Sequence, residues 1–188
     1  MADTGWKYPG TVEEDDTVGN TEWIDINNVK ADDGSYAFSS IGGGGGDPGD
    51  TKDYSVKLVK GGSITGNEKA EDTALPDGTF GTRTYGNSTD LWGTTLTKSD
   101  VEASNFGVVI SYYLEEFSTT YYIKATNFGF SIPADATIDG VEVEVEHRQR
   151  FEQFAEYADV DYIKMKVYYT DTGGEEEATS LIQSIIIP

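Results

Sequence analysis

The chain has 188 residues, which is enough for one domain with a hydrophobic core. Its 34 acidic and 13 basic residues give a formal charge of −21. This balance argues against nucleic acid or an anionic membrane as a partner, and favours basic surfaces or divalent cations. The absence of cysteine excludes disulfides and thiolate chemistry, and no apolar run reaches the ~20 residues of a spanning helix.

The first 22 residues are polar, acidic and rich in glycine and threonine. They contain an acidic run at 13–16 that is typical of a solvated loop rather than of a metal site. We predict that residues 1–22 form an N-terminal arm. Trp6 and Tyr8, in "GWKYPG", are the aromatic residues that we expect to carry its contacts with other proteins.

Three short segments in the next forty residues have strand patterns. They are "EWIDI" at 22–26, "GSYAFSSI" at 34–41 and "DYSVKLVK" at 53–60. Gly61-Gly62 then predicts a two-residue hairpin turn. Five glycines and Asp-Pro-Gly-Asp separate the second segment from the third. Forty residues could not bury a core alone, so we interpret the glycines as a crossover inside one domain rather than as a linker between two.

A single helical turn is predicted at "TKSDVEAS". Ser99 would cap this turn, and Glu102, three residues later, would complete a capping box. Strand patterns dominate the rest of the second half. Apolar residues alternate in "GVVISYYLEEF", "TYYIKATNFGFSIP", "VEVEVEH" and "DYIKMKVYY". Lys164 and Lys166 are expected to face the glutamates of 141–147 across neighbouring strands. The echo between "SNFGVVIS" and "TNFGFSIP" predicts the same turn twice, with Gly107 and Gly129 at positive φ.

About eight short strands without sustained helical periodicity predict an all-β fold, an antiparallel β-sandwich of jelly-roll or immunoglobulin-like type. We place this single domain at 23–171, between the N-terminal arm and an acidic linker with an apolar strand or arm at 172–188. The apolar run either completes the chain's own sheet or adds to a neighbouring subunit. Its predicted contact residues are Leu181, Ile182, Ile185, Ile186 and Ile187.

The residues offer little catalytic chemistry. His147 is the single histidine, beside arginines and glutamates, and is predicted to be a surface residue at a strand end rather than a general base. No serine lies in a G-x-S-x-G turn and the glycine run lacks the residues of a phosphate-binding loop. We therefore expect no catalytic residue, no cofactor and no enzyme activity.

Calcium is the first of two ligands for which the sequence offers candidate residues. Asp32 and Asp33 in "ADDGS", and Asp47 and Asp50 in "DPGD", cluster oxygen ligands in loops, although neither loop has the spacing of an EF-hand. The alternative is that these aspartates are ordinary turn residues whose charges are solvated.

A sugar is the second candidate ligand. Trp6, Trp23 and Trp92 could form a platform on which sugar rings stack, and the alternative is that they fill a core or an interface.

Several longer motifs resemble a family of small all-β structural proteins of tailed bacteriophages and prophages. The distinctive ones are "STDLWGTTLTKSDVEASNFGV" and "NFGFSIPADATIDG", supported by "TGWKYPGTVEEDD", "NNVKADDGSYAFSS", "VKLVKGGSITGNEKA" and "DYIKMKVYYTD". Together they cover most of residues 4–171. In the family, the segment like 121–157 directly follows the "DGSYA" strand and the segment like 53–120 comes later. This chain has the reverse order, and the glycine run falls at one of the new joints.

The resemblance implies a virion protein that is made in the host cytoplasm. Members of the family include capsid decoration, head-fibre and tail-associated proteins. The expected function is capsid decoration, in which the protein binds the major capsid protein or another virion protein and is itself an oligomer, with a trimer favoured. One alternative is a glycan- or receptor-binding module of a head or tail fibre. Another is an engineered, topology-rearranged sandwich without a new activity.

Overall fold

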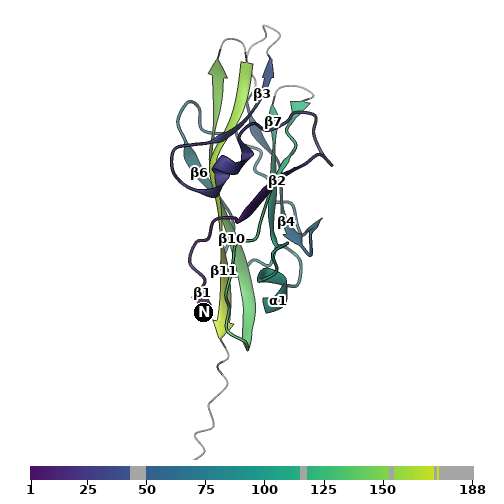
Figure 1. The fold of residues 1–188 in the computed structure, drawn as a ribbon, viewed down its shortest axis with the longest axis vertical. Coiled ribbons are helices and arrows are strands. Elements are labelled where there is room, and N and C mark those ends of the chain that lie inside the picture. Colours follow the sequence, from purple (N-terminus) through teal and green to yellow (C-terminus); the bar gives the residue numbers. More distant parts are fainter. Residues whose placement is uncertain (43–49, 115–117, 153–154, 172, 174–188) are drawn as a thin grey trace, which may run out of the picture.

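The structure is a computed structural model that describes residues 1–42, 50–114, 118–152, 155–171 and 173. Within these residues, two curled antiparallel sheets stack face to face in an elongated body (Figure 1). The predicted all-β, sandwich-like single domain is therefore confirmed. None of the helices among the described residues is long and apolar enough to cross a membrane.

The first sheet is built around one long hairpin. Strands β10 and β11 have 17 residues each, pair along their whole length and run through most of the body (Figure 1). The strand order is β1-β11-β10-β6, and β3 pairs with the other end of β11. The strands are β1 (Ala2–Asp3), β3 (Ala37–Gly42), β6 (Gly81–Gly86), β10 (Ala136–Glu152) and β11 (Ala155–Asp171).

The second sheet has the order β2-β9-β7-β4-β5, and the short β8 pairs with β7. Its strands are β2 (Thr11–Asp15), β4 (Lys52–Lys60), β5 (Ser63–Thr65), β7 (Gly107–Leu114), β8 (Ser118–Thr119) and β9 (Tyr122–Thr126). The chain thus leaves the first sheet at the end of β3 and enters the second at β4. The glycine run begins at Gly42, the last residue of β3, and its other glycines lie outside the described residues. It falls between strands of two sheets in one domain, as predicted.

The core lies between the inner faces of the two sheets. Val141, Val143 and Val145 of β10 are at most 1% exposed, as the strict alternation predicted. The second sheet contributes the alternating residues of β7, among them Ile110 and Leu114, which are fully buried. Each such side chain contributes about 1.5–3 kcal/mol through burial, so this double layer dominates the stability of the fold.

The N-terminal segment differs from the predicted arm. Strand β1 pairs with β11, and β2 pairs with β9, so residues 1–22 contribute to both sheets. The prediction of an arm there is wrong, because backbone pairing at sheet edges needs no hydrophobic signal in the sequence. The predicted C-terminal arm, with Leu181, Ile182, Ile185, Ile186 and Ile187, lies outside the described residues.

Turn residues fix the local geometry at two predicted positions. Gly61 and Gly62, at φ 60° and 83°, form the predicted two-residue hairpin between β4 and β5. The helix α1 (Lys98–Val101) also forms, but its cap is Thr97 rather than Ser99. The Thr97 side chain and Asp100 cap each other's backbone N–H groups in a capping box.

The segment at 22–26 is not the regular strand that its alternation predicted. Trp23 is buried, and Ile24 is half exposed and makes only an isolated bridge to Phe38. Asp25 then adopts a left-handed conformation at φ 55° and leads into the 3₁₀ helix η1 (Ile26–Lys30). This helix packs on β11 and brings the following loop, 31–36, next to the first sheet.

Candidate functional site

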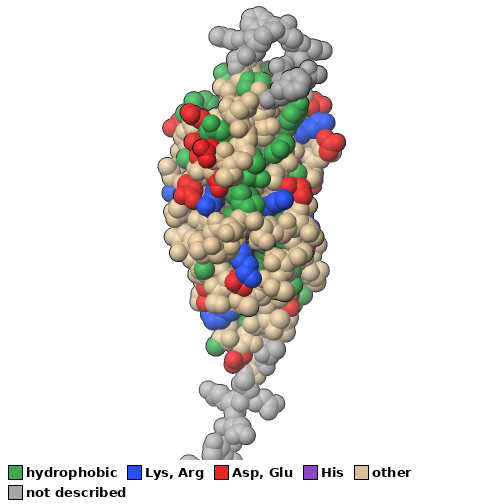
Figure 2. All heavy atoms as spheres, turned by 90° about the vertical axis from the view of Figure 1, so that its right-hand side faces the viewer, with side chains coloured by type: hydrophobic (Ala, Val, Ile, Leu, Met, Phe, Trp, Pro, Cys, Tyr) green, Lys and Arg blue, Asp and Glu red, His purple; other side chains and the backbone are tan. Residues whose placement is uncertain are grey.

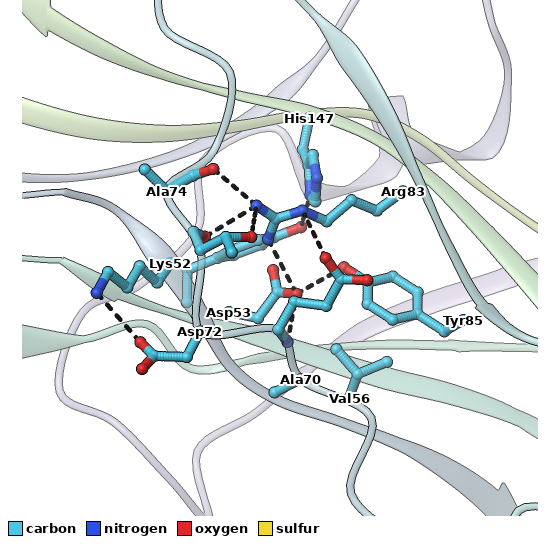
Figure 3. Close-up of polar contacts among 12 residues, drawn as sticks. Lys52, Asp53, Val56, Ala70, Asp72, Ala74, Arg83, Tyr85 and His147 are labelled. Atoms are coloured by element: carbon cyan, nitrogen blue, oxygen red, sulfur yellow. Dashed lines mark hydrogen bonds and ion pairs between the residues drawn. The ribbon is translucent and has the colours of Figure 1, made fainter.

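A group of polar side chains lies inside the sandwich and connects its two sheets (Figure 3). We define this buried polar cluster by five residues. They are Asp53 from β4, Arg83 and Tyr85 from β6, Tyr112 from β7 and His147 from β10. All but Arg83 are at most 7% exposed, and the Arg83 side chain is 11% exposed.

His147 belongs to this interior, which corrects the prediction of a surface histidine. The inward alternation of Val141, Val143 and Val145 continues along β10 to Glu152, so the next inward position is 147. His147 is fully buried there. The alternation alone would have given this answer, if the strand had been extended beyond the last valine.

Asp53 is the centre of the ionic half of the cluster. Its Oδ2 atom accepts a hydrogen bond of 2.8 Å from the Tyr85 hydroxyl and one of 3.1 Å from the Glu71 backbone N–H. The Arg83 guanidinium lies 3.1 Å from the same oxygen (Figure 3). Burial nevertheless raises the pKa of Asp53, and the positive charge of Arg83 opposes this shift.

His147 and Tyr112 form the uncharged half of the buried polar cluster. The Tyr112 hydroxyl lies 2.9 Å from Nδ1 of His147, and the two rings meet edge to face. Burial, together with the charge of Arg83, lowers the pKa of His147 to about 3, so the ring is neutral at physiological pH. Because His147 and Tyr112 are fully buried and Asp53 and Tyr85 nearly so, we interpret the cluster as an internal brace rather than as a catalytic centre.

An acidic cluster lies on the outer side of the first sheet. It consists of Asp32 in the loop after η1, Glu146 in β10 and Asp161 in β11, and one carboxylate oxygen of each lies within 4.8 Å of the others. Asp161 is 4% exposed. Burial raises the pKa of Asp161 to about 7, and the hydrogen bond and charge of Glu146 and the charges of Asp32 and Asp33 act in the same direction.

The predicted calcium residues are thus partly brought together. Asp32 meets two strand acids that the sequence analysis did not single out, and Asp33 is near enough to act on the pKa of Asp161. Asp50 is exposed and belongs to no acidic cluster among the described residues, and Asp47 lies outside them. No sequence motif joins these acids, because a loop and two strands supply them.

Beside the acidic cluster, paired charges cover the outer face of β10 and β11. Lys164 lies 2.7 Å from Glu144, and Lys166 lies 3.7 Å from Glu142, as predicted from the alternation. The indole of Trp6 lies beneath both ammonium groups, at 4.3 Å from Lys166 and 5.1 Å from Lys164. Trp6 is therefore already engaged within the domain.

The other predicted aromatic residues separate into two groups. Tyr8 is 38% exposed and makes an edge contact with Tyr162. Trp23 and Trp92 are buried, and the Trp92 indole donates a hydrogen bond of 3.0 Å to the Val141 carbonyl. The sugar platform of three tryptophans is therefore wrong, and the core interpretation is confirmed for Trp23 and Trp92.

The outer face of the second sheet carries apolar side chains that the sequence analysis did not recognise as a surface. In Figure 2, hydrophobic side chains form a strip over the upper half of the face that includes this sheet. Tyr54 is 49% exposed and Tyr113 is 36% exposed. We define the apolar strip by these two tyrosines together with the partly buried Val18 and Ile64, which pack on a small buried cluster of Val59, Val109 and Tyr122.

An open groove of about 550 Å³ lies at the other end of the body, between α1 and the start of β10. Its lining residues include Leu96, Lys98, Glu102 and Ile138.

Comparisons of this chain with protein-family models, with curated proteins and with solved structures find no match.

Proposed function

We propose that the protein is a structural component of a tailed-bacteriophage particle, and that it decorates and reinforces the outside of the capsid. The supporting sequence observation is the resemblance of its long motifs to phage structural proteins. The supporting structural observation is the apolar strip. The protein is proposed to act by binding, without catalysis and without a cofactor.

The apolar strip carries the proposal, because it lies on a sheet face of an otherwise strongly acidic protein. Tyr54 and Tyr113 offer large, stiff rings with a polar end, and tyrosine is enriched at protein interfaces. A formal charge of −21 favours a partner surface that is basic around an apolar centre. We infer that a virion shell protein with this surface is the occupant of the strip.

The interior of the sandwich suits a reinforcing role. A decoration protein stabilises a lattice only if it deforms less readily than the contacts that it spans. The buried polar cluster connects β4 and β7 of one sheet to β6 and β10 of the other. Breaking a buried ion pair of this kind costs about 3–5 kcal/mol, so the two layers resist sliding past each other.

Self-association is a further part of the proposal. The segment "LIQSIIIP" at 181–188 is apolar and β-prone, and a run of this kind can add a strand to the sheet of a neighbouring subunit. We propose that it does so in a trimer. Analytical ultracentrifugation of the full chain and of a chain that ends at Gly173 tests this, with a trimer expected for the first and a monomer for the second.

The decisive experiment is capsid binding. Purified capsids that lack this protein, from a phage that encodes it, are mixed with the full chain and sedimented. We expect co-sedimentation and a higher temperature of capsid opening. The double substitution Tyr54→Ser and Tyr113→Ser should weaken binding at least tenfold, because two interface anchors are lost. Tyr8→Ser changes an exposed tyrosine that packs on Tyr162 of the other sheet, and it is the control because the proposal places the contact at the strip rather than at Tyr8.

The same tyrosines support one alternative of another class, a glycan-binding module, because aromatic rings also stack on sugars. A glycan array with the full chain distinguishes the two. Saturable sugar binding that the double substitution abolishes, together with no co-sedimentation with capsids, would replace capsid decoration by receptor binding.

A further inference from the structure

The outer face of β10 carries a row of three glutamates, of which the third has a different environment. Glu142 and Glu144 each have a lysine of β11 opposite them, Lys166 and Lys164. Glu146 is the next outward residue, and it has no ion pair with a lysine or arginine within the described part of the chain. The carboxylates of Asp161 and Asp32 lie near it instead.

A β-bulge explains how two strand acids come together. The register between β10 and β11 shifts by one residue after Glu146, since Glu146 pairs with Tyr162 whereas His147 pairs with Val160. Asp161 is the extra residue, so two consecutive residues of β11 lie opposite Glu146. A regular ladder would have sent Asp161 to the opposite face from Tyr162. Bulges of this kind often re-aim a side chain at a functional site.

Asp161 supplies an observation that is independent of the clustering. The side chain is 4% exposed, and its Oδ1 atom is buried without a hydrogen-bond partner among the described residues. A buried carboxylate oxygen without a partner destabilises the fold, and a purely structural residue normally avoids such a position. The position therefore points to a group that would complete the coordination of this oxygen.

The geometry points to a calcium site formed by Asp32, Glu146 and Asp161. Two ligands on opposite sides of a calcium ion, each at about 2.4 Å, are about 4.8 Å apart, and the three oxygens lie within this distance of one another. Carboxylates are hard ligands that suit calcium. Asp33 adds negative charge nearby, and loop carbonyls and water would complete the coordination. The ion would take the place that Lys164 and Lys166 occupy beside the other two glutamates.

The chemistry of the surroundings selects against softer metals. The chain has no cysteine, and its one histidine projects from the inner face of β10, on the other side of the sheet from Glu146. Zinc and copper sites use thiolate or imidazole ligands, so neither metal fits the cluster as well as calcium does. Calcium bound here would also tie the loop at 31–34 to the central hairpin.

Isothermal titration calorimetry and thermal unfolding of the full chain, after removal of metal with a chelator, test the site with calcium chloride. We expect one site with a dissociation constant of roughly 0.1 mM, as in extracellular calcium modules. About 10 mM calcium should then raise the unfolding midpoint by roughly 5–10 °C. Asp161→Asn and Asp32→Asn should each weaken binding at least tenfold.

The two variants also separate binding from a purely structural role. Asp161→Asn should raise the metal-free unfolding midpoint, since it removes like-charge repulsion from a buried position. Asp32→Asn changes an exposed loop residue and leaves the strands intact. Asp50→Asn is the matched control, because it removes an exposed aspartate of the other predicted calcium loop and should leave calcium binding unchanged.

Three results would overturn the proposal. The first is the absence of calcium binding at about 10 mM, far above the expected dissociation constant, which would leave Asp161 and Glu146 as carboxyls that share a proton. The second is an equal response in wild type, Asp32→Asn and Asp161→Asn. The third is an equal shift with magnesium, which would assign the effect to screening of a highly charged protein. The site does not depend on the proposed capsid function, and either can fail alone.

Discussion

The hydroxyl of Tyr112 lies 2.9 Å from Nδ1 of His147, and this contact joins β7 of one sheet to β10 of the other inside the core. Both side chains are fully buried, so neither can exchange its partner for water. The contact is the neutral counterpart of the ion pair between Asp53 and Arg83, which connects the same two layers.

Tyr112→Phe should therefore lower the free energy of unfolding by about 1–3 kcal/mol, because it leaves a buried imidazole nitrogen without its partner. Urea denaturation followed by tryptophan fluorescence measures the change. Tyr54→Phe, which removes a hydroxyl from a half-exposed ring, should change the free energy by less than about 0.5 kcal/mol. Equal effects of the two substitutions would contradict the bracing role of the contact.

The cross-strand pairs should differ in strength because their distances differ. Lys164 and Glu144 are 2.7 Å apart, whereas Lys166 and Glu142 are 3.7 Å apart. Double-mutant cycles with Lys→Met and Glu→Gln should give a coupling energy of about 0.5–1 kcal/mol for the first pair and less for the second. A larger coupling for the longer pair would show that Trp6, beneath both lysines, controls their energetics instead.

Two glycines of the repeated Asn-Phe-Gly sequence should both lose stability on substitution by alanine, but for different reasons and to different extents. Gly107 begins β7, and a Cβ there would lie 1.9 Å from the Ala125 carbonyl oxygen, so Gly107→Ala should cost about 3 kcal/mol or more. Gly129 is at φ 65° with open space around it, so Gly129→Ala should cost only about 1–2 kcal/mol. Thermal unfolding of both variants would check the order, and a reversal would contradict the strand register.

Acid should selectively weaken the contacts of Glu102, the residue that caps the C-terminal end of α1. The hydrogen bond from Lys98, with a second from the Ile132 backbone N–H at 2.8 Å, lowers the pKa of Glu102. A carboxyl whose pKa is lower in the folded state stabilises the protein above its unfolded pKa, and this contribution disappears as the pH falls through the folded value.

Glu102→Gln should consequently destabilise the protein at pH 7, and the difference from wild type should shrink toward pH 3. Urea denaturation at both pH values measures it. An unchanged difference at the two pH values would mean that the side chain acts through its shape rather than through its charge.

Alternation predicted the strands that form the core, because a side chain that repeats every second residue must face one side of a sheet. Val141, Val143 and Val145, and the lysines opposite the glutamates, follow directly from it. The prediction from the repeated Asn-Phe-Gly sequence is correct for only one of its two glycines. Gly129 has the predicted positive φ, but Gly107 does not, since one copy of the sequence precedes a strand and the other follows one.

By itself, the sequence determined the fold class, the hairpin at Gly61-Gly62 and the inward valines at 141–145, since all three depend on neighbours along the chain. Only the tertiary structure decided that the first 22 residues join both sheets, that His147 meets Tyr112, and that a bulge places Asp161 beside Glu146 and Asp32. These depend on contacts between residues far apart in the chain. Hydrogen bonding and electrostatics at such contacts leave no periodic pattern in the order of residues.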